Sequence, residues 1–370
     1  MKILVQKEEL LNSLNIVSKA LKRGNLYQIL DCVLIDASKN KIVLTCQDGK
    51  EITIKNDLNG TIVEKGVAAI DGSLLIDIIR SIREDLEIEI SVDKNRDCII
   101  KCGNIRDYKI QAKDETTYPN ITSINKENKI VLNELKIKKI LEKTIFSYDK
   151  NLDSGNIILK GIYFNVNKES FIAKSMDGYI ISIVNEVIND NNGKYETIVP
   201  GSSLEELNKL IKGEVNKDVY VYFNEKNIAF EFNNTLFTSI IIPNKYIDTD
   251  RIFNVEYSTK VNIDRNEFLQ GLIMSTPLLK ENENKPIILD IKDENMAISL
   301  NTLSGDSYGK VEIKKTGKDL MIAFNANYLI KVLRVIDDNN ITLYFSGPKN
   351  PIIIKDKQET YSYLITPVKI

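Results

Sequence analysis

The chain repeats itself at a fixed spacing. Shifted by 129 positions, the sequence matches its own beginning without a gap from Leu30 to Ile82. The matching pairs are Leu30 with Leu159, Val33 with Ile162, Lys39 with Lys168, Asp48 with Asp177, Gly49 with Gly178, Ile52 with Ile181, Ile54 with Ile183, Gly72 with Gly201, Ser73 with Ser202 and Ile82 with Ile211. Such a repeat decides the architecture before any local pattern does, because each copy folds into the same kind of unit.

A third copy is more diverged and lies 254 positions from the first. Its residues Leu329, Ile330, Val332, Leu333, Arg334 and Ile336 repeat the helical pattern of Leu75, Ile76, Ile78, Ile79, Arg80 and Ile82. A chain of 370 residues also exceeds what a single hydrophobic core usually serves. We therefore predict three domains, at residues 1–126, 127–255 and 256–370.

Each copy is predicted to contain two helices and two groups of strands. Apolar residues at helical spacing open the three copies: Leu10, Leu11, Leu14, Val17 and Leu21, then Ile137, Ile140, Leu141 and Ile145, then Phe268, Leu272 and Ile273. In the first copy, β-branched runs predict strands at residues 32–36, 42–46, 51–55, 87–92, 98–102 and 108–112, and a second helix at residues 73–82. The predicted fold class is α+β, with helices packed on one side of antiparallel sheets.

The composition argues against an enzyme. The chain has no histidine, which removes the usual general base, the usual activator of a nucleophile and the commonest zinc ligand. It also has no glycine-rich phosphate loop. A hydrolase that uses a carboxylate pair such as Asp36 and Asp48 is an alternative, but the repeat scatters acidic residues into turns. We predict no catalytic residues.

The four cysteines are expected to be reduced, partly buried thiols. Cys32, Cys46, Cys98 and Cys102 lie in one third of the chain and form no paired CxxC motif. Cys98 and Cys102 would share one face of a strand, but two thiolates without a histidine make a poor metal site. We predict neither a metal nor a cofactor.

The start of the chain does not resemble a targeting segment. Only three apolar residues separate Lys2 from the polar run that begins at Gln6, so neither a signal peptide nor a membrane span is predicted there. We expect a cytoplasmic protein.

Several local motifs point to one family. They are Glu8–Leu11 in the first helix, Ile29-Leu30 at a strand entry, Tyr118-Pro119-Asn120 at the end of the first repeat, the Asp177-Gly178 turn, and the apolar tail from Tyr363 to Ile370 around Pro367. With the three α+β copies, they make the whole chain resemble the bacterial DNA sliding clamp, the beta subunit of DNA polymerase III. The resemblance implies a head-to-tail homodimer that forms a ring around duplex DNA, with helices lining the hole, and a non-catalytic role in polymerase processivity.

A ring accounts for the nearly neutral chain. The formal charge is −2, from 50 basic and 52 acidic residues, which is unlike a protein that grips phosphates tightly. Enclosure needs only weak contacts that are independent of sequence. The repeat places a basic residue at one position of the second helix in every copy, and a second position is basic in two copies. The predicted DNA-facing residues are Arg80, Lys209 and Arg334, then Arg83 and Lys212, with Arg23 in the first loop.

The resemblance also implies a cleft between the second and third domains that holds a short peptide from the polymerase, the clamp loader or other partners. The matching positions are Leu159, Asp177, Gly178, Ile181, Ile247, Arg251, Ile252, Leu364, Pro367 and Val368. Such an apolar groove with polar edges suits a leucine or phenylalanine anchor. For the dimer interface, the matching positions are Tyr108, Leu278 and Leu279.

Some positions depart from the family pattern. Tyr179 and Ile180 follow the Asp-Gly turn where the family commonly has histidine and arginine, and Thr366 replaces a methionine before the tail proline. Ile157-Ile158 replaces an aromatic pair, and Gly24 replaces an arginine beside Arg23. The alternative function is therefore a diverged clamp paralogue that serves as a protein-interaction scaffold.

Overall fold

Every repeat of the structure follows one order of elements. The computed structural model describes residues 1–21, 27–83, 85–151, 155–188, 193–279 and 285–369. The first repeat contains β1 (Lys2–Gln6), α1 (Lys7–Val17), β2 (Cys32–Asp36), β3 (Ile42–Gln47), β4 (Ile52–Leu58), β5 (Thr61–Glu64), β6 (Val67–Asp71), α2 (Gly72–Ser81), β7 (Glu87–Val92), β8 (Asp97–Cys102) and β9 (Arg106–Gln111).

The second repeat has the same order, and its described residues include no counterpart of β5. It contains β10 (Lys129–Asn133), α3 (Glu134–Glu142), β11 (Gly161–Val166), β12 (Ser170–Met176), β13 (Ile180–Val187), β14 (Tyr195–Pro200), α4 (Gly201–Leu210), β15 (Asp218–Phe223), β16 (Asn227–Phe232) and β17 (Thr235–Ile240). A four-residue helix, α5 (Asp250–Phe253), lies in the connector to the third repeat.

The third repeat ends with the last described strand. It contains β18 (Thr259–Asp264), α6 (Arg265–Ser275), β19 (Ile287–Lys292), β20 (Asn295–Thr302), β21 (Gly305–Glu312), β22 (Lys314–Gly317), β23 (Leu320–Phe324), α7 (Ala326–Val335), β24 (Asn340–Phe345), β25 (Ile352–Lys355) and β26 (Tyr361–Ile365). Short 3-10 turns lie at η1 (Ser18–Ala20), η2 (Gln28–Asp31), η3 (Glu115–Thr117), η4 (Ile157–Lys160) and η5 (Thr276–Leu278).

The prediction that a helix opens each repeat was wrong. A strand opens each copy, and β1, β10 and β18 pair antiparallel with β7, β15 and β24. Each opening strand buries only a few alternate apolar residues, such as Ile3 and Val5 in β1. Its partner lies far along the chain, so neither a long alternation nor a hairpin turn marks it in the sequence. The other predicted strands and both helices of the first repeat are confirmed within a few residues.

Local capping explains where several helices start. Asp71, Asp264 and Asn325 accept hydrogen bonds from backbone N–H groups in the first turn of α2, α6 and α7. A side-chain oxygen at this position satisfies a donor that has no partner within the helix. The first helix is also tied to the second half of its own repeat in every copy, because the N–H groups of Lys7, Glu134 and Arg265 donate to the carbonyls of Leu86, Lys217 and Asn339.

The backbone contacts divide the chain into two compact units, each described by itself. The first contains residues 1–137 and 202–241, and the second contains residues 138–201 and 242–370. The middle repeat contributes to both, because two sheets each run through two consecutive repeats. The division at residues 126 and 255 stays a prediction about the repeats as units of sequence.

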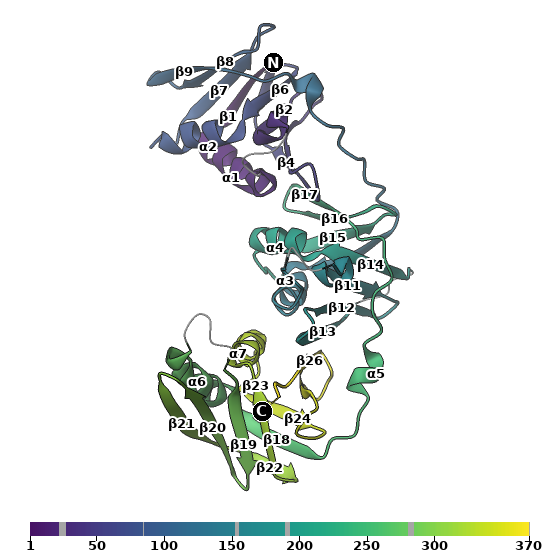
Figure 1. Ribbon diagram of the computed structural model, residues 1–370. Helices are drawn as coiled ribbons and strands as arrows, with labels where there is room; N and C mark the ends of the chain where they lie inside the picture. The colour runs from purple at the N-terminus through teal and green to yellow at the C-terminus, as the bar shows by residue number, and fades with distance from the viewer. Residues whose placement is uncertain (22–26, 84, 152–154, 189–192, 280–284, 370) are drawn as a thin grey trace. The chain divides into compact units, whose positions relative to one another are not determined.

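In the first unit, a sheet passes from the second repeat into the first. Its strand order is β10-β15-β16-β17-β4-β3-β2-β6, and the junction is the antiparallel pair β17–β4, with Phe237 opposite Ile54 (Figure 1). A second sheet has the order β5-β1-β7-β8-β9. Helices α1 and α2 contact each other, and α1 packs against β3 and β4.

In the second unit, a corresponding sheet joins the third repeat to the second. Its order is β14-β11-β12-β13-β26-β25-β24-β18-β22, and the junction is β13–β26, with Ser182 opposite Tyr363. The fourth sheet has the order β21-β20-β19-β23. Both junctions therefore join the last strand of one repeat, β17 or β26, to the equivalent strand β4 or β13 of the repeat before it.

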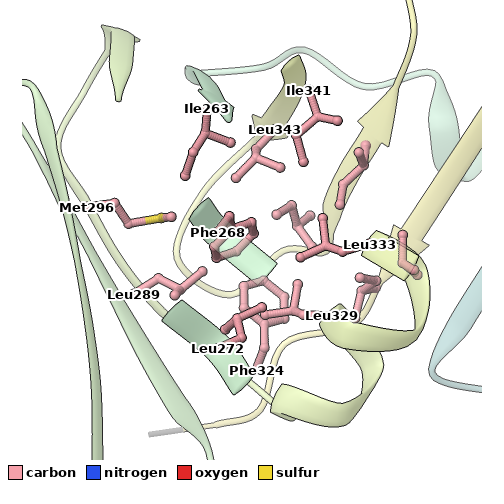
Figure 2. Packing of buried hydrophobic residues seen from close by; sticks show 14 of the residues in the cluster. Ile263, Phe268, Leu272, Leu289, Met296, Phe324, Leu329, Leu333, Ile341 and Leu343 are labelled. Atoms are coloured by element: carbon pink, nitrogen blue, oxygen red, sulfur yellow. The ribbon is translucent and has the colours of Figure 1, made fainter. Parts of the chain in front are cut away.

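The core of the third repeat lies between its two helices and both of its sheets. Figure 2 shows Phe268 and Leu272 of α6 facing Leu329 and Leu333 of α7, with Phe324 beside them. Strand residues also belong to the cluster, among them Ile263, Leu289, Met296, Ile341 and Leu343. All of these side chains are buried, and such burial is the main stabilising contribution to a fold of this kind.

One backbone hydrogen bond recurs at the end of every repeat. The N–H groups of Lys113, Ile242 and Val368 donate to the carbonyls of Ala69, Ile198 and Ala323, each over 2.8 Å. In the first two repeats the chain continues from this bond as a connector, at residues 113–128 and 242–258. In the third repeat the same bond holds the C-terminal tail. The tail thus occupies the place of a third connector.

Among the residues that the structure describes, no helix combines the length and the apolar character needed to cross a membrane.

Candidate functional site

An apolar cluster covers one face of the sheet where the second and third repeats join. Its buried members are Met176, Ile181, Ile198, Ile242, Tyr246, Ile353 and Leu364, and half-buried members include Leu159, Tyr163 and Phe253. Ile181 lies directly opposite Leu364 across the β13–β26 pair. Three of the residues predicted to form the peptide cleft, Leu159, Ile181 and Leu364, therefore belong to one cluster, which we call the junction cluster.

Alternation along the strands separates this cluster from the core. Ile180 and Tyr363 belong to the core of the third repeat, whereas their neighbours Ile181 and Leu364 belong to the junction cluster. Successive residues of a strand point to opposite faces of a sheet. The junction cluster therefore lies on the face away from α6 and α7, where it is not covered by those helices.

The Asp177-Gly178 turn beside this cluster is open. The carboxylate of Asp177 accepts hydrogen bonds from the N–H groups of Tyr179 at 2.9 Å and Ile180 at 2.7 Å, which fixes the turn. Gly178 has a φ of +91°, and a Cβ added there would meet nothing within 4 Å. At the matching turn of the first repeat, a Cβ on Gly49 would lie 2.4 Å from Cδ1 of Leu30. The same turn is filled in the first repeat and faces free space in the second.

The C-terminal tail is docked beside this turn. Thr366 N–H donates to the carbonyl of Tyr179 over 2.9 Å, and Val368 N–H donates to Ala323. Pro367, between them, is half-buried, and Val368 is slightly exposed. A short terminus would fray without such partners. Ile370, which was predicted to belong to the tail, lies outside the described residues.

The connector carries the remaining predicted cleft residues between two apolar anchors. Tyr246 stacks on Tyr163 with ring centroids 4.9 Å apart, and Phe253 packs against the junction cluster. Between these anchors, Ile247 is 40% exposed and Ile252 is 42% exposed. Arg251 is exposed as well. Exposed aliphatic side chains beside a buried cluster are typical of a surface that a partner covers.

Sequence reasoning missed an aromatic pair at this site. Tyr179, 55% exposed, stacks on Tyr328 of α7 with ring centroids 5.2 Å apart and an interplanar angle of 23°. Burial, followed by the nearby Asp177 carboxylate, raises the pKa of Tyr328. The sequence contained only one hint of this pair, namely that Tyr179 departs from the family's histidine. Nothing in the sequence joined it to Tyr328.

The recurring basic residues share one place in the fold. Arg80, Lys209 and Arg334 each lie in the last turn of the second helix of a repeat, and each is exposed. Arg80 lies 3.8 Å from Asp77, and Lys209 lies 2.7 Å from Glu206. Cations at a helix C-terminus are stabilised by the helix dipole, which is a structural reason for the pattern.

The other predicted basic residues are placed differently. Lys212 is exposed and lies beyond the end of α4, which ends at Leu210. Arg83 lines a pocket of about 500 Å³ with Ile82, Leu86, Ile105 and Tyr108. It therefore lies beyond the end of α2, beside the predicted interface residue Tyr108. Arg23 lies outside the described residues.

The predicted interface residues of the third repeat lie at the end of α6. Leu278 and Leu279 are half-buried and pack against the edge of its core. Other apolar residues of the third repeat are exposed, namely Met274, Leu303 and Tyr308.

The cysteines are buried, as predicted. All four are free thiols, and burial raises the pKa of Cys98 to about 12. Within the described part of the chain, no group of three or more His, Cys, Asp or Glu side chains is arranged to hold a metal ion.

Comparison with known proteins assigns each repeat to a known domain. The family of the DNA polymerase III beta subunit matches with its N-terminal domain at residues 1–122, its central domain at residues 131–248 and its C-terminal domain at residues 250–369. The chain belongs to the DNA polymerase III beta subunit family. The family and fold predicted from the sequence are therefore confirmed.

Relatives match over the full length. The beta sliding clamp of Staphylococcus epidermidis is 25% identical over 380 residues, covering 100% of this chain and 99% of that protein. A solved structure of a putative DNA polymerase III beta subunit from Eubacterium rectale is 35% identical, with a TM-score of 0.96 over 100% of this chain and 99% of that one. The DNA polymerase sliding clamp of Bacillus subtilis, 24% identical over the same shares, has the same fold with a TM-score of 0.95. The prediction of a sliding clamp rather than a hydrolase is confirmed.

The matching turns at Gly178 and Gly49 allow a test in which one variant is the control for the other. Gly178→Ala should lower the free energy of unfolding by about 1–2 kcal/mol, because only the positive φ opposes an alanine. Gly49→Ala should lower it further, because the added Cβ also collides with buried Leu30. Urea denaturation of both variants checks the order, and equal losses would contradict an open turn at Gly178.

Proposed function

We propose that two copies of this chain close head to tail into a ring that encircles duplex DNA and holds a DNA polymerase on it. The observation that carries the proposal is the way the repeats join. Pairs β17–β4 and β13–β26 continue a sheet from one repeat to the next, and β9 and β21 stand at the outer ends of their own sheets. Within their repeats, these two strands are equivalent to the strands that form the junctions.

A strand edge with free N–H and C=O groups favours pairing with another strand. β9 is the counterpart of β17 and β26, and β21 is the counterpart of β4 and β13. If two copies join as the repeats join within the chain, β9 of one copy pairs with β21 of the other. The same contact formed in both directions closes a dimer of six repeats and leaves neither edge free.

The junctions within the chain also give the register. Tyr108, Phe237 and Tyr363 are equivalent residues of their strands, because each lies five positions before the donor of the recurring bond, Lys113, Ile242 or Val368. On the partner strands β4, β13 and β21, the equivalent residues are Ile54, Ser182 and Ser307. Each directly precedes the second residue of the matching hairpin pairs Thr45–Lys55, Lys174–Ile183 and Ser299–Tyr308. Because Phe237 faces Ile54 and Tyr363 faces Ser182, Tyr108 is expected opposite Ser307 of the other copy. Lys109 is then opposite Asp306, which pairs opposite charges.

Packing behind the strands supports the same arrangement. At the junction of the second and third repeats, Phe146 lies against Tyr363 with ring centroids 5.9 Å apart. Phe146 and Leu278 occupy equivalent positions. Each is followed by a residue whose N–H closes a turn, since Ser147 donates to the carbonyl of Thr144 and Leu279 donates to that of Thr276. Leu278 and Leu279 are therefore proposed to pack on Tyr108 of the other copy, at the pocket that Tyr108 lines.

The register predicts the effect of reversing charges. Asp306→Lys should weaken the dimer roughly tenfold, because two lysines would then face each other. Adding Lys109→Glu should restore most of the affinity, although the new carboxylate also lies near Asp97. Sedimentation equilibrium measures both, and Leu279→Asp, which buries an unpaired carboxylate, gives the monomer reference. A double variant as weak as Asp306→Lys alone would contradict this register.

The basic helix ends are proposed to face the DNA. One such residue per repeat gives six in a dimer, which provides weak phosphate contacts spread around a ring. The chain's net charge of −2 fits retention by enclosure rather than by tight binding. We further propose that partners other than the polymerase, including a clamp loader, use the junction cluster.

Reversing the three residues together tests this face. Arg80→Glu, Lys209→Glu and Arg334→Glu in one chain should reduce loading on closed circular DNA, or retention after loading, with the fold intact. A matched control reverses three exposed lysines in turns, Lys94, Lys226 and Lys349, one in each repeat. Gel filtration of labelled circles measures retention. An equal loss in both triple variants would show an effect of net charge and not of this face.

The tail is proposed to form one wall of the peptide site. Removing residues 366–370 deletes both backbone bonds that dock the tail, so binding of a labelled peptide with leucine and phenylalanine should be lost. Removing only residues 369–370 keeps both bonds and should preserve binding. Fluorescence anisotropy measures the peptide and light scattering the dimer mass, which should not change. Loss of the dimer in the longer truncation would make the tail a structural element of the ring.

A further inference from the structure

A lysine stands at one strand position where the other two repeats have small hydroxyl residues. Thr45, Lys174 and Ser299 are equivalent residues of β3, β12 and β20. The side chain of Lys174 is only 13% exposed, and its Nζ lies 2.7 Å from Oδ1 of Asp250. Nζ also donates to Oγ1 of Thr249 over 3.4 Å. The lysine therefore reaches from the second repeat to the connector.

The two connectors are fastened by different means. In the first, the hydroxyl of Tyr118 donates to the carbonyl of Thr45, and Nε2 of Gln47 donates to the carbonyl of Pro119. Both bonds are within hydrogen-bond range, at 3.4 Å and 3.1 Å. They tie the first connector to β3 at its tyrosine and at the residue that follows.

The second connector lacks both of these bonds. Tyr246 lies one residue closer to the recurring bond of its connector than Tyr118 does in the first, and its buried hydroxyl has no hydrogen-bond partner among the described residues. Met176 stands where the first repeat has Gln47 and has no donor group. The charged contact of Lys174 with Asp250 and Thr249 thus takes over a task that neutral hydrogen bonds perform in the first repeat.

The segment that this contact holds cannot stabilise itself. α5 has four residues, far fewer than an isolated helix needs, and its N-cap residue Thr249 makes no side-chain cap. Ile252 N–H bonds to the carbonyl of Thr249, so the position of Thr249 sets that of Ile252. Arg251 and Ile252, both exposed, are carried on this turn.

The lysine of this contact is held along its stem. Asp250 is 78% exposed, but the lysine stem is buried against the sheet face that carries Tyr163 and Ile183. A lysine held along its stem loses little further freedom when it binds a carboxylate. The arrangement directs the ammonium group at α5.

We propose that Lys174 is a positioning residue for the partner-binding surface, which clasps Thr249 and Asp250 and so fixes the orientation of Arg251 and Ile252. The inference rests on the proposed peptide-binding role of the junction cluster. Lys174 acts through α5 and does not touch the bound peptide. Partners with the same leucine and phenylalanine anchors would bind less well when the clasp is open.

The test uses the full-length chain and the labelled peptide with leucine and phenylalanine. Lys174→Met keeps an apolar stem and removes the charge, and Asp250→Asn removes the other charge at an exposed site. Each should weaken the peptide about three- to tenfold, and the double variant should be no weaker than either single one. Lys168→Met, an exposed lysine in the preceding turn, is the matched control and should leave the affinity unchanged.

Hydrogen exchange gives a second readout that needs no peptide. The Ile252 amide should exchange several-fold faster in Lys174→Met and in Asp250→Asn, with the amides of β12 unchanged. Unchanged exchange at Ile252 would overturn the clasp, whatever the peptide does. If the wild type binds the peptide, faster exchange at Ile252 with unchanged peptide affinity would overturn the role of the clasp in partner binding. If the wild type binds no peptide, the proposed site fails, while exchange still decides whether the clasp exists.

Discussion

Backbone pairing at the ends of sheets is the constraint on which the rest of this structure depends. A repeat of this kind leaves a strand at the end of each of its two sheets, and such strands are open to further pairing. Two junctions within the chain satisfy β17 with β4 and β26 with β13. Because the repeats are joined by continuous sheets, side chains from two repeats meet on one sheet face. The junction cluster exists for this reason.

The two junctions share this continuity but differ in how much apolar surface they leave exposed. At the first, Leu30 fills the space beside Gly49, and neutral hydrogen bonds hold the connector down. At the second, Gly178 faces free space and the connector presents exposed aliphatic residues. One kind of junction thus occurs within a single chain in a closed form and an open form. Comparing the two separates the features that both junctions share from those proposed to serve partner binding.

How far the sequence could be interpreted depended on the range of each interaction. β2 and β7 were predicted to the residue, because alternation and turns are local signals. The opening strands were missed because their partners lie most of a repeat away. The cleft residues Leu159, Ile181 and Leu364 were named through resemblance, and the structure gathers them in one cluster. The Tyr179–Tyr328 stack and the Lys174 contact were not predictable, since each joins residues that no pattern connects. Arg83 shows the limit of repeat logic, because its match with Lys212 predicted a DNA-facing role, whereas Arg83 lines a pocket with Tyr108.

The docking bond of the tail has a consequence for covalent connectivity. Val368 binds Ala323 as Lys113 and Ile242 bind Ala69 and Ile198, so the tail leaves its repeat at the place where the two connectors leave theirs. In the proposed dimer, each of the two junctions between copies is then a junction of the ordinary kind that no covalent connector crosses. A tandem gene fusion that continues Lys369 through a copy of residues 114–128 into a second Met1 would supply one of them. Such a fused ring would keep a single seam, and all of its opening would take place there.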